Sequence, residues 1–425
     1  MTEELLHFIW KYKKLPLRDL LTTKKEQLHI IDLGTHNFYA GPDFFNARLK
    51  INGQLWAGNV EIHLKSSDWY AHSHEKDANY DNVILHVVWQ DDVSVFRSDN
   101  SEIATLELRQ VISPDLLLAY RNLMDQRQKT FINCERQIGQ IEGITWANWL
   151  DRLYIERLES KSDLIRRRLE RSNNDWEQVL FYLLLKNFGS KVNAASFMGL
   201  ADVIDFSMVR KLQQNVFQLE SFFFGLIGLL DRKDIDDIYY LALSKEFHFL
   251  QRKYCLVTSV VPKPDFFKLR PHNFPTIRLS QLAMLYGKRP NLFSKTIQAD
   301  TLEDYYNLYG AEASTYWKTH FTFGKSSKQS SKRLTKSFIN LLLINTILPL
   351  KYAYSRTQGQ ALNVPIVEVM TNIGKEDNHI IAHFESLGMP VQNAMEGQSV
   401  LQLFKEYCSK NHCLRCAVAQ KLLHA

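Results

Sequence analysis

The chain has few cysteines and no long uninterrupted apolar segment. Five cysteines occur among 425 residues, and their odd number and uneven spacing argue against a disulfide framework. The most apolar runs, 222–230 and 338–350, are too short for a membrane span or contain asparagine. The first fifteen residues carry Glu3 and Glu4 where a signal peptide would have an apolar core. These absences predict a cytoplasmic protein with no membrane partner.

The chain also lacks an internal repeat and a strong excess of one charge. No repeat of the length found in solenoids recurs, which argues against that architecture. The net charge is +6, but residues 1–110 hold 12 basic and 16 acidic residues, whereas the rest hold 40 and 30. An acidic segment beside a basic one would suit a metal site next to a surface that binds a polyanion. Ordinary surface variation explains the same counts equally well.

The periodicity of apolar residues predicts a mixed α/β domain at the start of the chain. A helix is expected at 3–14, because its apolar residues recur at helical spacing. Strands are expected where apolar residues alternate or run together, at 28–33, 43–51, 55–65, 83–89, 93–97 and 103–108. Asn52-Gly53 separates the second strand from the third and is the strongest short signal for a β-hairpin.

From residue 112 onward the pattern is mostly helical. Helices are expected at 146–171, 176–188, 217–230, 235–243, 281–285, 338–348 and 378–387. A proline-rich segment at 263–278 and a basic segment at 324–337 are expected to be irregular. The predicted class is therefore α+β, with an α/β domain at 1–111 followed by a helical region at 112–425.

The stretch 41–65 carries the residues that most clearly indicate chemistry. Alternate residues of a strand face the same side, so Glu61, His63 and Lys65 are expected to project together. Asp43 would lie near Glu61 if the two strands of the hairpin pair in the simplest register. Two carboxylates could bind Mg²⁺ or Mn²⁺, which would activate a water molecule. Lys65 or His63 would then act on a phosphate or on the water.

Pro42-Asp43, followed on the next strand by Glu61-Ile62-His63, resembles the motif of the PD-(D/E)XK nuclease superfamily. The resemblance implies a restriction-endonuclease-like fold over about residues 1–111 and divalent-metal-dependent hydrolysis of DNA or RNA. In this family an upstream helix can add an acid, here Glu4. His63 stands where the family has lysine, and Lys65 lies on the same face one step later.

The departure at His63 leaves a second interpretation open. A catalytically inactive protein with a nuclease fold could bind nucleic acid or act as a scaffold. Several other segments, Gly-Pro-Asp-Phe, Val-Glu-Ile-His, Ser-Asp-Trp with His-x-His, and 270–278, look like a family of uncharacterised bacterial proteins. That family is described only as a domain of unknown function. The likeness extends to the C-terminal cysteines, and it implies no activity.

Histidines are concentrated in the same part of the chain as the acidic pair. Seven of the 14 histidines lie within residues 1–110. His72 and His74, separated by one residue, could join His63 in holding zinc or another transition metal, which would indicate a zinc hydrolase. Surface positions for His72 and His74 are equally consistent with their polar surroundings. His86 lies in an apolar strand and is predicted to be a hydrogen-bonded core histidine.

A second candidate metal site lies near the end of the chain. The segment 408–416 holds three of the five cysteines, Cys408, Cys413 and Cys416. Three cysteines in nine residues indicate a soft-metal site, either zinc or an iron–sulfur cluster. Cys134 is the best candidate for a fourth ligand and His412 the local alternative, whereas Cys255 is expected in the core. Some PD-(D/E)XK nucleases carry a four-cysteine iron–sulfur clasp, and the likeness here is one of layout.

The basic segment 324–337 is a candidate nucleic-acid contact. It holds five positive charges and no acid: Lys325, Lys328, Lys332, Arg333 and Lys336. With Arg270 and Arg278 in the proline-rich segment, these residues could neutralise phosphates. A solvated loop, and ion pairs with the protein's own acids, are equally consistent. Thr319 stands where the first glycine of a P-loop belongs, so a P-loop is rejected.

Overall fold

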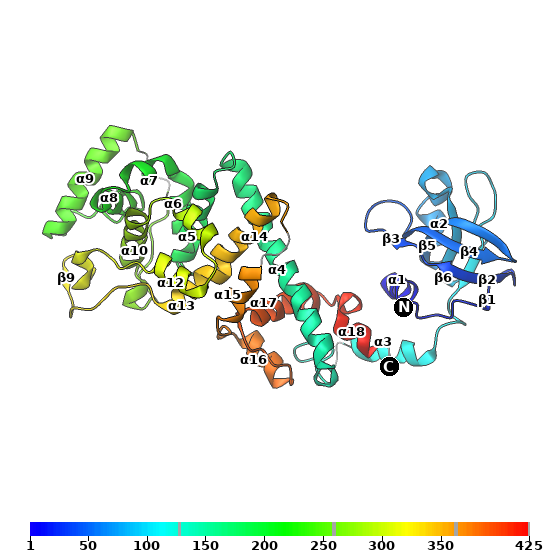
Figure 1. The fold of residues 1–425 in the computed structure, drawn as a ribbon. Helices are drawn as coiled ribbons and strands as arrows, with labels where there is room; N and C mark the ends of the chain where they lie inside the picture. The colour runs from blue at the N-terminus through cyan, green and yellow to red at the C-terminus, as the bar shows by residue number, and fades with distance from the viewer. Residues whose placement is uncertain (126–128, 257–260, 361–363, 424–425) are drawn as a thin grey trace. The chain divides into compact units, whose positions relative to one another are not determined.

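A computed structural model of the protein describes residues 1–125, 129–256, 261–360 and 364–423 (Figure 1). These residues form two units, one made of Met1–Trp146 with Phe404–Ala425 and the other of Ala147–Leu403. The second unit is therefore inserted into the sequence of the first. The predicted boundary after residue 111 falls where the sheet ends, and the units themselves divide after Trp146 and after Leu403.

A mixed seven-stranded sheet forms the centre of the first unit. Its strands are β1 (Leu20–Leu21), β2 (Gln27–Asp32), β3 (Thr35–His36), β4 (Phe44–Ile51), β5 (Gln54–Lys65), β6 (Val83–Gln90) and β7 (Thr105–Glu107). The order across the sheet is β1-β2-β4-β5-β6-β7, and β3 pairs with β4. Strands β1, β2, β4 and β5 pair antiparallel, whereas β5, β6 and β7 pair parallel. An N-terminal sheet domain of mixed topology is thus present, as the sequence predicts.

The hairpin of β4 and β5 has the two-residue turn that Asn52-Gly53 predicts. Ile51 pairs with Gln54, and the φ angles of Asn52 and Gly53 are both positive, at 49° and 82°. Positive φ at both positions is the conformation that matches the twist of a hairpin, and asparagine and glycine adopt it most easily. The predicted strand at 93–97 is wrong, because only an isolated bridge between Phe96 and Glu102 forms there.

Helix α1 (Glu3–Lys11) packs on the sheet through the apolar face that its sequence predicts. Leu5, Leu6 and Ile9 are fully buried, and the indole N–H of Trp10 donates to Leu33 O at 3.0 Å. The helix ends before the predicted residue 14, because Lys13 adopts a positive φ of 54° that breaks the helical repeat.

The crossover from β5 to β6 and the C-terminal segment complete the first unit. The crossover holds α2 (Asp68–Ala71), η1 (His74–Lys76) and η2 (Ala78–Tyr80). After the sheet come α3 (Pro114–Met124) and η4 (Ile138–Gln140), and the C-terminal segment adds η8 (Leu403–Cys408), η9 (Cys413–Arg415) and α18 (Ala417–Leu422). This segment contacts α1 and the turn after it, since Lys14 Nζ donates to Leu423 O at 3.3 Å and Arg415 pairs with Glu4 at 3.3 Å.

The second unit is almost entirely helical. Helix α4 (Gly143–Arg171) leads into it, and its remaining helices are α5 (Trp176–Phe188), α6 (Ala194–Val203), α7 (Phe206–Leu212), α8 (Val216–Leu226), α9 (Ile238–Tyr254), α10 (Pro275–Lys288), α11 (Leu292–Gln298), α12 (Leu302–Tyr309), α13 (Lys336–Leu342), α14 (Leu348–Thr357), α15 (Val364–Thr371), α16 (His379–Ser386) and α17 (Ala394–Gln402). Short 3-10 turns, η5 (Pro271–Asn273) and η6 (Thr315–Lys318), a π-helix, η7 (Leu343–Ile347), and a hairpin of β8 (His320–Thr322) and β9 (Lys325–Ser326) lie between them. Over the described ranges, no helix is both long and apolar enough to cross a membrane.

Three expectations for this unit are corrected. The end of the proline-rich segment is helical, because Pro275 occupies the first position of α10, where its missing N–H has no helical partner to lose. The basic segment is partly ordered, because it begins in the β8–β9 hairpin and buries Lys332. Cys255 is exposed, because it caps the polar end of α9 with a left-handed φ of 52°.

Helices α8 and α9 approach each other closely at Gly225. A Cβ atom on Gly225 would lie 2.1 Å from ring carbons of Phe247, which is only 4% exposed. Nearby, Ser221 Oγ donates to Leu243 O at 2.7 Å across the same interface. The absent side chain of Gly225 therefore sets the spacing of the two helices.

We expect Gly225→Ala to lower the free energy of unfolding of the second unit by roughly 1–3 kcal/mol, because overpacking outweighs the better helix propensity of alanine. Urea unfolding followed by circular dichroism measures the change. Gly374→Ala, in the same unit, is the matched control, since among the described residues no atom lies within 4 Å of its added Cβ. Equal stability of the two variants would contradict the proposed close contact.

Candidate functional site

Asp43 and Glu61 are held together by their own backbones. Glu61 Oε2 accepts a hydrogen bond from Asp43 N at 3.0 Å, and Asp43 Oδ2 accepts one from Ile62 N at 3.0 Å. The register that pairs Phe44 with Val60 places the start of β4 beside this part of β5, and the register then shifts between Phe44 and Ala47. The structure thus brings together the two carboxylates that the sequence analysis singles out.

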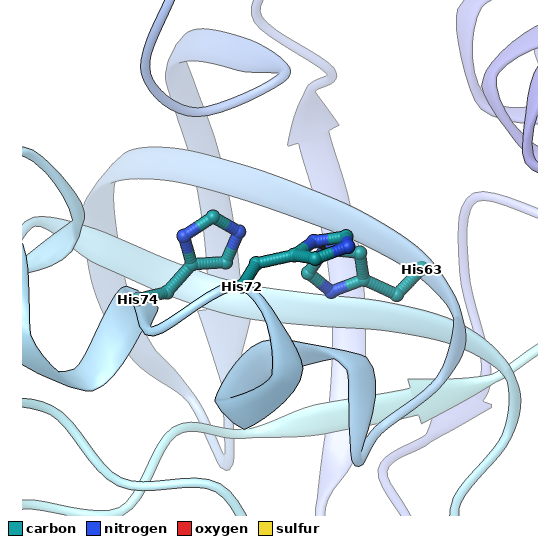
Figure 2. Close-up of side chains that lie close together, drawn as sticks. All are labelled: His63, His72 and His74. Carbon is teal, nitrogen blue, oxygen red and sulfur yellow. Dashed lines mark hydrogen bonds between the residues drawn. The ribbon is translucent and has the colours of Figure 1, made fainter.

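Three histidines lie close together in the first unit, as Figure 2 shows. One ring nitrogen from each of His63, His72 and His74 lies within 4.8 Å of the others. His72 Nδ1 lies 3.2 Å from His63 Nε2. Glu61 Oε1 lies 3.5 Å from His63 Nε2 and 3.4 Å from His74 Nε2. Glu61 Oε1 therefore lies beside two of the three clustered histidines, His63 and His74.

The local backbone explains how residues from separate elements meet there. Glu61 and His63 alternate along β5 and share a face. His72 follows α2, His74 begins η1, and Ser73 between them has a left-handed backbone with φ 61° and ψ 31°. This reversal lets His72 and His74 approach the same space. The ring of His74 is also stacked on Tyr80, with centroids 3.7 Å apart.

His86 fixes the orientation of the His63 ring. His63 Nδ1 lies 2.9 Å from His86 Nε2, and His86 is fully buried on β6. The prediction that His86 is a hydrogen-bonded core histidine is confirmed. Where His63 Nδ1 carries the proton of this hydrogen bond, the lone pair of His63 Nε2 is directed at Glu61 and His72. Partners of this kind orient histidine ligands in metal sites.

Burial keeps both Glu61 and His63 uncharged at neutral pH. Burial, with the charge of Asp43 adding to it, raises the pKa of Glu61 to about 9. Burial, with the charges of His74 and His72 adding to it, lowers the pKa of His63 to about 3. At neutral pH Glu61 is therefore protonated and His63 is neutral when no cation is present. A metal ion would replace the proton of Glu61 and use the free lone pair of His63.

The sequence analysis missed His7. His7 Nε2 lies 3.1 Å from Asp43 Oδ2. Burial lowers the pKa of His7, but the hydrogen bond to Asp43 and the charges of Asp43 and Glu3 together raise it above its ordinary value. Burial also raises the pKa of Glu3, which lies close enough to feel the charges of His7, Asp43 and His72. The i, i+4 spacing of Glu3 and His7, which places both residues on one face of the helix, is the sequence feature that could have indicated them. The predicted acid, Glu4, points elsewhere and pairs with Arg415.

Lys65 lies at the exposed end of β5. Its backbone N–H donates to Asp68 Oδ2 at 2.9 Å. In the described part of the chain, no hydrogen bond or ion pair joins the Lys65 ammonium group to Asp43 or Glu61. Of the four predicted catalytic residues, the structure brings together Asp43, Glu61 and His63.

The cysteines Cys134, Cys408, Cys413 and Cys416 form a second cluster. Cys413 and Cys416 are buried, and Cys134 and Cys408 are half-buried. Burial, with the charges of Cys416 and Cys413 adding to it, raises the pKa of Cys134. Burial and the nearby Cys416, Cys134 and Cys413 raise the pKa of Cys408 in the same way. The cysteine that is distant in sequence therefore lies among the three C-terminal ones.

The candidate nucleic-acid-binding residues fall into two groups. Arg278 and Lys332 are buried, and their polar groups bond within the protein. Arg278 donates to Gln281 and Asn273 and stacks on Phe338, while Lys332 lies over the ring of Phe321, 4.0 Å from its centroid. The remaining four are exposed: Arg270, Lys325, Lys328 and Arg333.

Comparison with known proteins places the chain in a family without assigning it an activity. No curated protein and no solved structure matches the chain. Residues 3–379 match the model of one family, whose description is "Protein of unknown function (DUF2851)". The matched region includes Asp43, Glu61, the three clustered histidines and Cys134. The protein therefore belongs to the DUF2851 family.

Proposed function

We propose that the protein is a metal-dependent hydrolase of phosphodiester bonds, a nuclease acting on DNA or RNA. Its metal would be held by His63, His72, His74 and Glu61. The observation that carries this proposal is the convergence of three imidazole nitrogens and Glu61 Oε1 beside a second carboxylate, Asp43.

The donor set favours a transition metal. Imidazole nitrogen suits zinc and related ions, whereas Mg²⁺ prefers a shell of oxygen atoms. Three histidines and one carboxylate therefore support zinc or Mn²⁺ more strongly than Mg²⁺. Because His63 is buried and His72 is exposed, the site is closed on one side and open to solvent on the other. An open position for water or substrate is typical of catalytic metal sites.

The neighbouring residues supply the parts of a hydrolytic mechanism. The metal would lower the pKa of a bound water and neutralise charge on the phosphate. Asp43, paired with His7, lies beside the ligand Glu61 and could accept the proton of that water. The likeness of Asp43 and Glu61 to the acidic pair of PD-(D/E)XK nucleases supports a phosphodiester as the substrate.

The loop before Asp43 has surface features that suit a nucleic acid. Phe38 and Tyr39 are 69% and 89% exposed. Lys11 lies over the Phe38 ring, with its Nζ atom 5.4 Å from the centroid. Exposed aromatic faces beside lysines bind the bases and phosphates of single strands. These residues support a single-stranded substrate or a single-stranded end.

One observation favours the alternative, an inactive nuclease-like protein that binds nucleic acid or acts as a scaffold. The PD-(D/E)XK motif needs a lysine beside its acids, whereas His63 takes that position here and Lys65 makes no contact with the carboxylates. In this interpretation the protein would bind nucleic acid in a salt-sensitive manner without cleaving it.

We expect Asp43→Asn and Glu61→Gln each to lower the cleavage rate by about a hundredfold or more, because each removes a group that binds metal or moves a proton. The assay uses labelled single-stranded and double-stranded DNA and RNA with Mn²⁺, Zn²⁺ or Mg²⁺. Asp81→Asn, at an exposed position, is the control and should retain full activity. Cleavage that survives both substitutions would refute the proposal, and binding without turnover would support the alternative.

We expect the affinity for the metal to rise as the pH increases from about 7 to 9. Glu61 has a pKa of about 9 without metal, so in this range the cation must displace its proton. His63, with a pKa of about 3, carries no competing proton there. Calorimetry in buffers of different ionisation enthalpy should detect about one proton released per metal bound at pH 7. Glu61→Gln should abolish this release.

The raised pKa of Glu61 also makes the stability of the metal-free protein depend on pH, and here the effect of rising pH is unfavourable. Glu61 is ionised above its ordinary pKa of 4.5 in the unfolded chain but only above about 9 in the folded one. The stability of the metal-free first unit should therefore fall as the pH rises through this window, and bound metal should remove the effect. A metal affinity that does not change with pH would contradict the assignment of Glu61 as a ligand.

A further inference from the structure

The four clustered cysteines are brought together by two segments that lie side by side. Segment 129–134 contacts segment 404–413 at three successive points. Lys129 Nζ donates to Asn411 Oδ1 at 3.0 Å, and the rings of Phe131 and Phe404 are stacked with centroids 4.8 Å apart. Asn133 Nδ2 donates to Cys413 Sγ at 3.3 Å. Cys134 follows Asn133 directly, so this contact places it beside the C-terminal cysteines.

The surroundings of the cysteines suit a group that carries negative sulfur ligands. The hydrogen bond from Asn133 to Cys413 Sγ is of the kind that stabilises thiolate ligands in metal clusters. The ammonium group of Lys129 lies close enough for its charge to act on both Cys408 and Cys413. Burial raises the pKa of Cys134, Cys408 and Cys413, so these groups are neutral thiols without metal. A metal centre would displace their protons, and the amide of Asn133 and the charge of Lys129 would help to stabilise the thiolates that form.

The spacing of the cysteines along the sequence favours an iron–sulfur cluster over a single zinc ion. Four and two residues separate Cys408, Cys413 and Cys416, and the fourth cysteine, Cys134, is distant in sequence. Three clustered cysteines and one distant cysteine occur in iron–sulfur proteins, whereas structural zinc sites usually hold their ligands in two close pairs.

We propose that Cys134, Cys408, Cys413 and Cys416 bind an iron–sulfur cluster at a site separate from the histidine site. Four cysteine thiolates are the ligand set of such clusters. The cluster would fasten the C-terminal segment to the rest of the first unit. That segment also contacts α1, which carries His7 on another face. The cluster would therefore brace the helix that contributes to the candidate active site.

The test is the content of iron and acid-labile sulfide in the full-length protein after anaerobic purification and reconstitution with ferrous iron and sulfide. We expect equal amounts of iron and acid-labile sulfide, with at least about two of each per chain, visible absorption from sulfide-to-iron charge transfer, and a paramagnetic signal after reduction. Single substitutions to serine at Cys134, Cys408, Cys413 or Cys416 should remove most of the iron. Cys255→Ser is the matched control, because Cys255 is exposed at the end of α9, and it should keep the full cluster.

The outcomes separate this proposal from the function proposed above, because none of these measurements uses nuclease activity. One zinc ion per chain that is lost with the cysteines would overturn the iron–sulfur assignment. A folded wild-type protein that takes up neither iron nor sulfide, or variants that all retain iron, would overturn it as well. If the serine variants do not fold, as judged by circular dichroism, the iron and sulfide content of the wild-type protein and of Cys255→Ser still decides the question.

Discussion

The arrangement of the first unit depends on the burial of one carboxyl group. Glu61 is 5% exposed on β5, at the point where the sheet changes from antiparallel to parallel pairing. Burying a carboxylate without a compensating charge is costly, so its neighbours must supply either a proton or a cation. The register of the β4–β5 hairpin brings Asp43 N to one oxygen, and the reversed backbone at Ser73 brings His74 to the other. The hairpin register and the backbone of Ser73 together place Glu61 among groups that can bind a metal.

A second buried carboxyl group, Glu220 on α8, shows what a purely structural site looks like in the same protein. Its oxygens accept hydrogen bonds from Trp317 Nε1 at 2.8 Å and Ser314 Oγ at 3.1 Å, and from the Tyr239 hydroxyl. Every neighbour named there is a donor that titrates far from neutrality or does not titrate. Glu61 Oε1 instead faces imidazole nitrogens, which can give up their protons and bind metal. Both carboxyl groups are buried, so the difference between the two sites lies in the chemistry of their partners.

Features that depend on neighbouring residues in sequence were predictable, and features that depend on side-chain direction were not. The Asn52-Gly53 hairpin and the apolar strand β6 follow from local pattern, and so does the proximity of Asp43 to Glu61. The role of His7 depends on the rotational phase of α1, which a shift of one residue from Glu4 to Glu3 changes by about 100°. The meeting of His72 with His74 depends on the left-handed backbone of Ser73, which serine rarely adopts. Arg278 was misleading because its charge suggests a surface residue, whereas its planar group packs on Phe338.

The insertion of the second unit between Trp146 and Phe404 has a consequence for biosynthesis. During translation the ribosome delivers the sheet and Cys134 first and then the whole helical unit. The other three cysteines of the cluster, Cys408, Cys413 and Cys416, follow only afterwards. Nascent chains tend to fold domain by domain in order of synthesis. The sheet must therefore wait, with the surface of α1 that meets Arg415 still uncovered, until translation of the second unit is complete. A chain that stalls between Trp146 and Phe404 would expose the surface of α1 that meets Arg415, and Cys134 would lack the other cysteines of the cluster. We therefore expect truncated products to be targets for chaperones and proteases.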